Sequence, residues 1–151
     1  MDFHTLLKRW RGKNDATTAV AEPAAPAAEE GAVVAELLHL GASQRRHAQH
    51  EEAARTLTRA IELKHDCGDA HHELGLVHLE QGRFEDAADC FQLAVHFAPN
   101  LAAAHRDLGT ALAQLGRVAE AEAACRRALE IEPQSAAGWF QAGNACKSGG
   151  R

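Results

Sequence analysis

The sequence predicts an all-α fold in which one antiparallel helix hairpin is repeated along the chain. Gly41, Gly75 and Gly109 lie 34 residues apart, and each of them follows a leucine. Alanines recur twelve and nineteen residues after each glycine, at Ala53, Ala87 and Ala121 and at Ala60, Ala94 and Ala128. A fixed period of this length is typical of helical repeat arrays. No segment has the pattern of a sheet.

The first 13 residues combine apolar and basic side chains at helical spacing. The apolar residues follow an i, i+3, i+4, i+7 pattern at Phe3, Leu6, Leu7 and Trp10, and the basic ones around them are Lys8, Arg9, Arg11 and Lys13. One interpretation is a short amphipathic helix that makes weak contact with an anionic membrane surface or a partner's groove. The alternative is a disordered tail, or one that folds back loosely on the repeats, because isolated helices this short are marginal in water.

Residues 14–32 are predicted to be a flexible linker before the repeats. They are rich in alanine, proline, glutamate and threonine, and include Pro23 and Pro26. Such a composition cannot bury enough apolar area to offset the entropy of ordering the chain. The array is then expected over residues 33–151, with three full repeats and a partial fourth at 34–67, 68–101, 102–135 and 136–151.

Each full repeat is predicted to contain two amphipathic helices joined by a short turn. In the second repeat Leu74 and Val77 lie on one helical stripe, and Phe84, Ala87 and Phe91 lie on the next. The turns Gln81-Gly82-Arg83 and Leu115-Gly116-Arg117 place glycine where a helix ends in the left-handed conformation. A glycine inside a helix costs about 1 kcal/mol relative to alanine. The glycines at the 34-residue spacing therefore predict close helix packing, and we expect them to face Ala53, Ala87 and Ala121.

This pattern resembles the tetratricopeptide repeat family, with small residues at the eighth and twentieth places and Pro99 and Pro133 near the ends of two repeats. The family's fourth-place tryptophan is present only at Trp139, and its eleventh-place tyrosine is replaced throughout. The resemblance implies a right-handed superhelical solenoid that binds a peptide or protein segment in a concave groove. The partial fourth repeat would leave an apolar helix face uncovered, so we expect the sequence to be the front part of a longer protein.

The resemblance also implies which residues line the groove. In this family the second, fifth, sixth, ninth, twelfth and thirteenth places of each first helix point inward. In the first two repeats these places include Leu38, His39, Ala42, Arg45 and Arg46, then Asp69, His72, Glu73, Leu76 and Glu80. In the third and fourth they include Ala103, Arg106, Asp107, Thr110 and Gln114, then Phe140, Gln141, Asn144 and Lys147. The expected groove is acidic in the middle and basic at both ends.

Two binding patterns of the family fit this groove poorly. The clamp for a peptide's C-terminal carboxylate needs lysine, asparagine and basic residues at places that here hold Leu38, Ala42, Glu73, Ala103 and Asp107. The asparagine ladder of O-linked sugar transferases uses asparagines at the sixth and ninth places, and only Asn144 matches. This weakens the idea of a transferase arm without removing it.

Several other function classes lack their signatures. The formal charge is -5 and the second repeat is strongly acidic, whereas general nucleic-acid binding needs a basic stripe. The sequence contains no membrane-length apolar run and no signal-peptide core, so we expect a cytoplasmic protein. His72-Glu73 lacks the second histidine of a His-Glu-x-x-His zinc site. The cysteines Cys67, Cys90, Cys125 and Cys146 form no Cys-x-x-Cys pair. No metal, cofactor or catalytic site is predicted, and the histidines at helix positions are expected to be packing residues.

These observations favour a non-catalytic scaffold that binds a protein or peptide partner. The alternative is the substrate-presenting arm of a larger bacterial enzyme, such as an O-linked glycosyltransferase whose catalytic part would follow Arg151.

Overall fold

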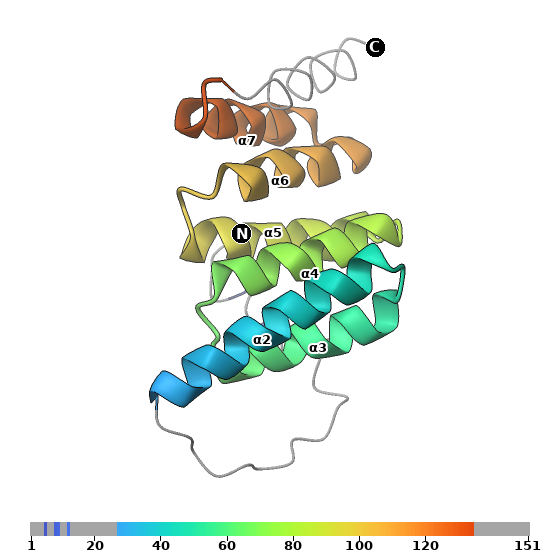
Figure 1. Ribbon diagram of the computed structural model, residues 1–151. Coiled ribbons are helices and arrows are strands. Elements are labelled where there is room, and N and C mark those ends of the chain that lie inside the picture. Colours follow the sequence, from blue (N-terminus) through green and yellow to red (C-terminus); the bar gives the residue numbers. More distant parts are fainter. Residues whose placement is uncertain (1–4, 6–7, 10–11, 13–26, 135–151) are drawn as a thin grey trace.

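The computed structural model describes Thr5, Lys8, Arg9, Gly12 and residues 27–134. Between Ala27 and Ile131 the chain forms six helices, α2 Ala27–Arg46, α3 His50–Leu63, α4 Gly68–Glu80, α5 Phe84–Phe97, α6 Ala102–Gln114 and α7 Val118–Ile131. They pair as three antiparallel hairpins stacked in chain order (Figure 1). The predicted all-α repeat solenoid is confirmed.

Helix α2 begins at Ala27, earlier than the predicted start of the array at residue 33, so residues 27–32 of the predicted linker are helical. Its first residues are alanines, which favour helix, followed by Glu29 and Glu30, which interact well with the positive end of the helix dipole. The rest of the predicted linker, residues 14–26, and the partial repeat from Ala136 lie outside the described residues.

The turns inside the three hairpins share one backbone geometry. Gly82 and Gly116 have φ of 72° and 74°, as the predicted left-handed helix ends require, and Ala48 takes the same place in the first hairpin with φ 58°. The amide after each of these residues returns to the helix, for example Arg83 N–H to the His78 carbonyl at 2.9 Å. The residue itself donates to a closer carbonyl, as Gly82 does to Leu79 at 3.0 Å. This pair of bonds satisfies two of the last carbonyls of each first helix.

The core runs through the stack as two clusters that meet at α5. The first cluster is centred on the fully buried Leu57, Ile61 and Leu93, and the second on the fully buried Phe91 with Leu108 and Leu112. Each cluster joins side chains from neighbouring hairpins. A single hairpin could not bury its apolar stripe alone, and stacking supplies the missing surface.

The repeated glycines mark the closest approach of the two helices in each hairpin, as predicted. A Cβ atom added at Gly41, Gly75 or Gly109 would lie 2.6, 2.6 or 2.5 Å from Leu57, Phe91 or Cys125, respectively. The expected partners Ala53, Ala87 and Ala121 are fully buried, but only Ala121 contributes one of the nearest atoms, its carbonyl oxygen. The side chain nearest to each glycine is therefore not the expected alanine, although Ala121 lies close to Gly109 through its backbone. The crossing places the glycine over the residue one helical turn further along the second helix.

The first helices of neighbouring hairpins lie closer together than the second helices do. The backbones of α2 and α4, and of α4 and α6, come close to each other, whereas those of α3 and α5, and of α5 and α7, lie farther apart. First helices that approach one another from repeat to repeat form the inner side of a curved stack. None of the described helices is both long and apolar enough to cross a membrane.

Candidate functional site

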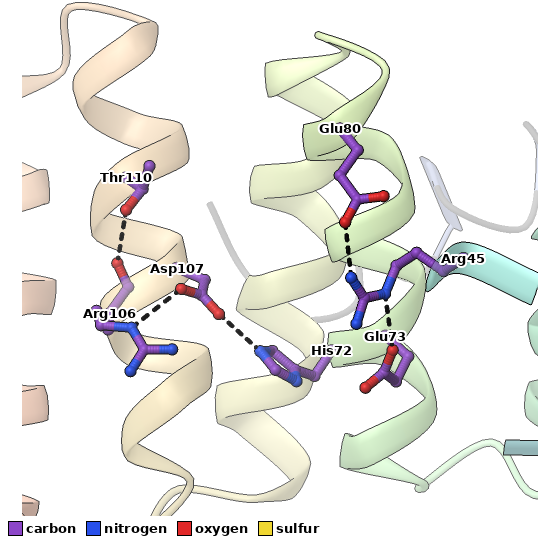
Figure 2. A network of polar contacts seen from close by, with 7 residues as sticks. All are labelled: Arg45, His72, Glu73, Glu80, Arg106, Asp107 and Thr110. Carbon is purple, nitrogen blue, oxygen red and sulfur yellow. Dashed lines mark hydrogen bonds and ion pairs between the residues drawn. The ribbon is translucent and has the colours of Figure 1, made fainter. Parts of the chain in front are cut away.

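Arg45 connects the first two repeats on the inner side of the stack. From α2 its Nε donates to Glu73 Oε2 at 3.1 Å and its Nη1 to Glu80 Oε1 at 2.6 Å, both on α4 (Figure 2). The Arg45 and Glu73 side chains are 17% and 23% exposed. One guanidinium thus holds two carboxylates that lie two helical turns apart, in the fork geometry that suits arginine.

The surroundings of Arg45 stabilise its protonated, positively charged form. Burial alone would lower the pKa of Arg45, but the hydrogen bond to Glu80 and the charge of Glu73 outweigh it and raise that pKa. Glu80 also lies near His50 at the start of α3, with 3.5 Å between Nδ1 and Oε2. This group of polar side chains therefore includes the beginning of α3 as well as the first helices α2 and α4.

A second polar chain connects α4 to α6. His72 Nε2 lies 2.9 Å from Asp107 Oδ2, and Arg106 Nε donates to Asp107 Oδ1 at 3.2 Å (Figure 2). The Thr110 hydroxyl donates to the Arg106 carbonyl at 3.2 Å, one turn along α6. The His72 and Asp107 side chains are only 13% and 11% exposed. Asp107 therefore receives two donors in a place with little access to water, as a buried carboxylate requires.

The two chains together form a line of polar contacts across all three first helices. We call this the first-helix ladder, and it consists of Arg45, Glu73, Glu80, His72, Arg106 and Asp107. Two of the three inter-repeat contacts, Arg45 to Glu80 and His72 to Asp107, join residues 35 positions apart. The third, Arg45 to Glu73, joins residues 28 positions apart.

The remaining residues predicted for the groove divide into four groups. Leu38 and Leu76 are partly buried and pack against the two core clusters. His39, Arg46, Asp69 and Gln114 are exposed on the first helices, and Ala42 and Ala103 are half-buried. Phe140, Gln141, Asn144 and Lys147 lie outside the described residues. The structure thus pairs the ladder residues with one another, whereas His39, Arg46, Asp69 and Gln114 remain exposed.

His71, at the fourth place of the second repeat, is a packing residue, as expected, and His105 at the same place of the third repeat is half-buried. His71 is fully buried and stacks on Phe97 with ring centroids 5.5 Å apart. Its Nε2–H donates to the His65 carbonyl at 3.0 Å, and His105 repeats the bond to the Pro99 carbonyl at 2.9 Å. Within the described part of the chain, no three His, Cys, Asp or Glu side chains are placed to hold a metal ion.

The ladder shows what the sequence interpretation missed. The residues of the middle groove were predicted as separate ligand contacts, but in the structure they are partners of one another. Only the complementary signs of Arg45 and of Glu73 and Glu80, on adjacent first helices, could have indicated this. Charges already paired within the protein are less available to a ligand than exposed ones.

Comparison with known proteins agrees with the repeat pattern. Two sequence profiles of the tetratricopeptide repeat match residues 38–102 and 78–142. No curated protein matches the sequence. Among solved structures, a Thermobaculum terrenum O-GlcNAc transferase mutant has 28% identity and a TM-score of 0.73, over 77% of this chain but only 22% of the transferase.

Two further solved structures are isolated repeat domains. The Arabidopsis OM64 tetratricopeptide repeat domain has 24% identity and a TM-score of 0.74, with 78% of this chain and 98% of that one covered. The second such domain of human RPAP3, solved with an HSP70 peptide, has 18% identity and the same TM-score and coverage. With these matches, the stacked hairpins and the packed glycines all in agreement, the chain belongs to the tetratricopeptide repeat family.

Proposed function

We propose that this chain is a non-catalytic scaffold that binds an extended peptide or protein segment along α2, α4 and α6. The observation that carries the proposal is the first-helix ladder, which ties the three first helices to one another on the inner side of the stack. A surface whose elements are fixed before binding loses less conformational entropy when a ligand arrives. The second RPAP3 repeat domain, solved in complex with an HSP70 peptide, supports the proposal because it shows that a domain of this fold can bind a peptide.

The chemistry of the ladder indicates what kind of ligand end does not belong there. Glu73 and Asp107 are carboxylates in ion pairs with side chains of the same surface. Both of them would repel a ligand's terminal carboxylate. To bind the basic side chains of the ladder, that carboxylate would have to displace Glu73 or Asp107 from them. We therefore infer that binding involves the body of a peptide, with exposed residues such as Arg46 and Asp69 meeting its charges.

A peptide selected from a random display library on the immobilised full chain provides the ligand for a test. Its affinity is measured by calorimetry for two first-helix variants, Arg46→Glu and Asp69→Lys. The matched controls are the same charge reversals on second helices, Arg126→Glu and Glu62→Lys. All four side chains are exposed, so the free energy of unfolding should stay within about 1 kcal/mol of the parent, including the helix-dipole interactions lost at Arg46 and Asp69.

We expect at least one first-helix reversal to change the dissociation constant by about two- to fivefold, as exposed charge pairs do. The controls should leave it unchanged. Loss of affinity confined to Arg126→Glu or Glu62→Lys would place the ligand on the second helices and contradict the proposal.

A second candidate function is the substrate-presenting arm of a larger enzyme. The likeness to the Thermobaculum terrenum transferase favours it, because this chain matches only 22% of that longer protein. Reading the gene beyond the codon for Arg151 distinguishes the two. A catalytic domain in the same reading frame would support the substrate-presenting arm. A stop codon at that point would contradict it and leave the scaffold as the proposed function.

A further inference from the structure

Arg9, near the beginning of the chain, makes an ion pair with the middle of the array. Its Nε lies 3.0 Å from Oδ2 of Asp89 on α5, 80 positions later in the sequence. The Asp89 side chain is only 13% exposed, whereas that of Arg9 is 39% exposed. A carboxylate so far removed from water is unfavourable unless donors or cations compensate it, and Arg9 supplies one such cation.

The ion pair lies in a hollow of about 390 Å³ on the second-helix side of the array. Glu85, Ala88, Asp89 and Gln92 of α5 form one wall, and Leu115, Arg117 and Glu120 around the start of α7 form the other. We call this hollow the α5–α7 notch. It does not include any residue of the first-helix ladder, so it is a different surface from the proposed groove.

The charges of the notch suit a basic occupant. Apart from Arg9, its wall has three carboxylates, from Glu85, Asp89 and Glu120, against the single guanidinium of Arg117. That guanidinium is already bonded to Glu120, with Nε and Nη2 at 2.8 and 2.6 Å from its two oxygens. The hydrogen bond from Arg117 lowers the pKa of Glu120 and keeps it ionised. The notch without Arg9 is therefore net negative, and Ala88 and Leu115 give it a small apolar part.

We propose that the α5–α7 notch is the docking site for the chain's own residues 1–13. This segment has the complementary charge in Lys8, Arg9, Arg11 and Lys13, and Phe3, Leu6, Leu7 and Trp10 give it an apolar stripe at helical spacing. Attachment to the same chain raises its effective concentration to the order of millimolar, so a few contacts are enough to hold it. A basic segment docked here is not presented to an anionic surface, and the intramolecular site competes with such a surface.

The test uses the full chain with Trp139→Phe as background, which leaves Trp10 as the only tryptophan. Acrylamide quenching and anisotropy of Trp10 fluorescence then report on the first segment alone. In this background we compare Arg9→Asp, Asp89→Arg and the charge-swapped double variant. The matched control is Glu62→Arg, an exposed carboxylate of α3 outside the notch. Circular dichroism checks the fold of each protein.

In the background protein, quenching should be weaker than in a synthetic peptide of residues 1–13, and it should rise toward the peptide value with added salt. Arg9→Asp should raise it to the peptide value, the double variant should restore protection, and Glu62→Arg should change nothing. If Asp89→Arg fails to fold, the comparison of Arg9→Asp with the background protein still tests the proposal. Arg9 lies outside the repeat array, so its substitution should leave the fold of the array intact. The proposal would be overturned if Trp10 were quenched equally in the background protein, in Arg9→Asp and in the peptide. It would also be overturned if Trp10 were quenched as strongly in a folded double variant as in Arg9→Asp. None of these readouts depends on ligand binding in the groove.

Discussion

Gly75 of α4 faces Phe91 of α5 so closely that a Cβ atom on the glycine would lie 2.6 Å from Cε1 of the ring. Phe91 is fully buried and cannot turn away. We predict that Gly75→Ala lowers the free energy of unfolding by about 1 to 3 kcal/mol through overpacking, in spite of the higher helix propensity of alanine.

The control for this variant is Gly31→Ala on α2, where an added Cβ would meet nothing within 4 Å. There alanine should stabilise the helix by up to about 1 kcal/mol. Chemical denaturation of both variants measures the difference. If Gly75→Ala were as stabilising as Gly31→Ala, the close packing of α4 on α5 would be wrong.

These glycines also show how far the sequence leads to the fold. The 34-residue spacing of Gly41, Gly75 and Gly109 predicts the hairpins and their tight crossing, and Gly82 and Gly116 predict the turns of the second and third hairpins. The spacing does not predict that the crossing partner is Phe91 rather than Ala87, because both are apolar residues one turn apart on α5. Which of them lies under the glycine depends on the angle and shift between the helices, and no spacing in the sequence records either.

Ala48 offers a second prediction, because it occupies the left-handed place that glycine fills in the other hairpins. The φ angle of Ala48 is 58°, compared with 72° for Gly82. A left-handed conformation costs an L-residue with a Cβ roughly 1–2 kcal/mol. Ala48→Gly should therefore raise the midpoint of thermal unfolding, and Gly82→Ala should lower it. Melts of the two variants beside the parent test this, and shifts of the same sign would contradict it.

The buried imidazole of His71 should make stability depend on pH. Burial lowers the pKa of His71 from its usual 6.5, and nearby His65 adds to this, while the hydrogen bond to the His65 carbonyl opposes it. As pH falls below about 6.5, the unfolded chain takes up the proton before the folded one does. The stabilisation is thus complete above pH 6.5 and is lost as pH falls from there toward the lowered pKa.

His71→Phe keeps a ring that can stack on Phe97 and removes the titrating group. Urea unfolding of this variant and of the parent between pH 7.5 and 5 compares their slopes with pH. The parent should lose more stability over this range than the variant does. Identical slopes would show that His71 gains or loses its proton equally in both states.

Arg45 should contribute more to stability than an exposed arginine in an ion pair does. Arg45→Met keeps much of the side chain's volume but leaves Glu73 and Glu80 without their guanidinium. We expect a loss of about 1 to 2 kcal/mol, since hydrogen bonds to charged, partly buried groups are worth this much. Arg127→Met is the matched control, because its pair with Glu130 is 52% and 55% exposed and should be worth less than about 1 kcal/mol. If chemical denaturation showed the same loss of stability for Arg45→Met and Arg127→Met, the ladder would not stabilise the fold more than an exposed ion pair does.

The candidate site was only partly predictable from the sequence. The family resemblance placed Arg45, Glu73 and Asp107 on first helices, and the structure brings them to one side of the stack. Their pairing across repeats joins residues 28 or 35 positions apart, and it depends on the way neighbouring hairpins shift against each other. The Arg9–Asp89 contact was less predictable still, because a linker separates the two residues and no repeat relates them.

The most direct test of the central claim is an NMR titration of the uniformly labelled full chain with the selected peptide. If the first helices form the binding surface, the largest amide shift changes should fall on α2, α4 and α6, around Arg46, Asp69 and Arg106. Amides on the outer faces of α3, α5 and α7 should change little. Shift changes concentrated on the second helices, with α2, α4 and α6 unaffected, would contradict the proposed function.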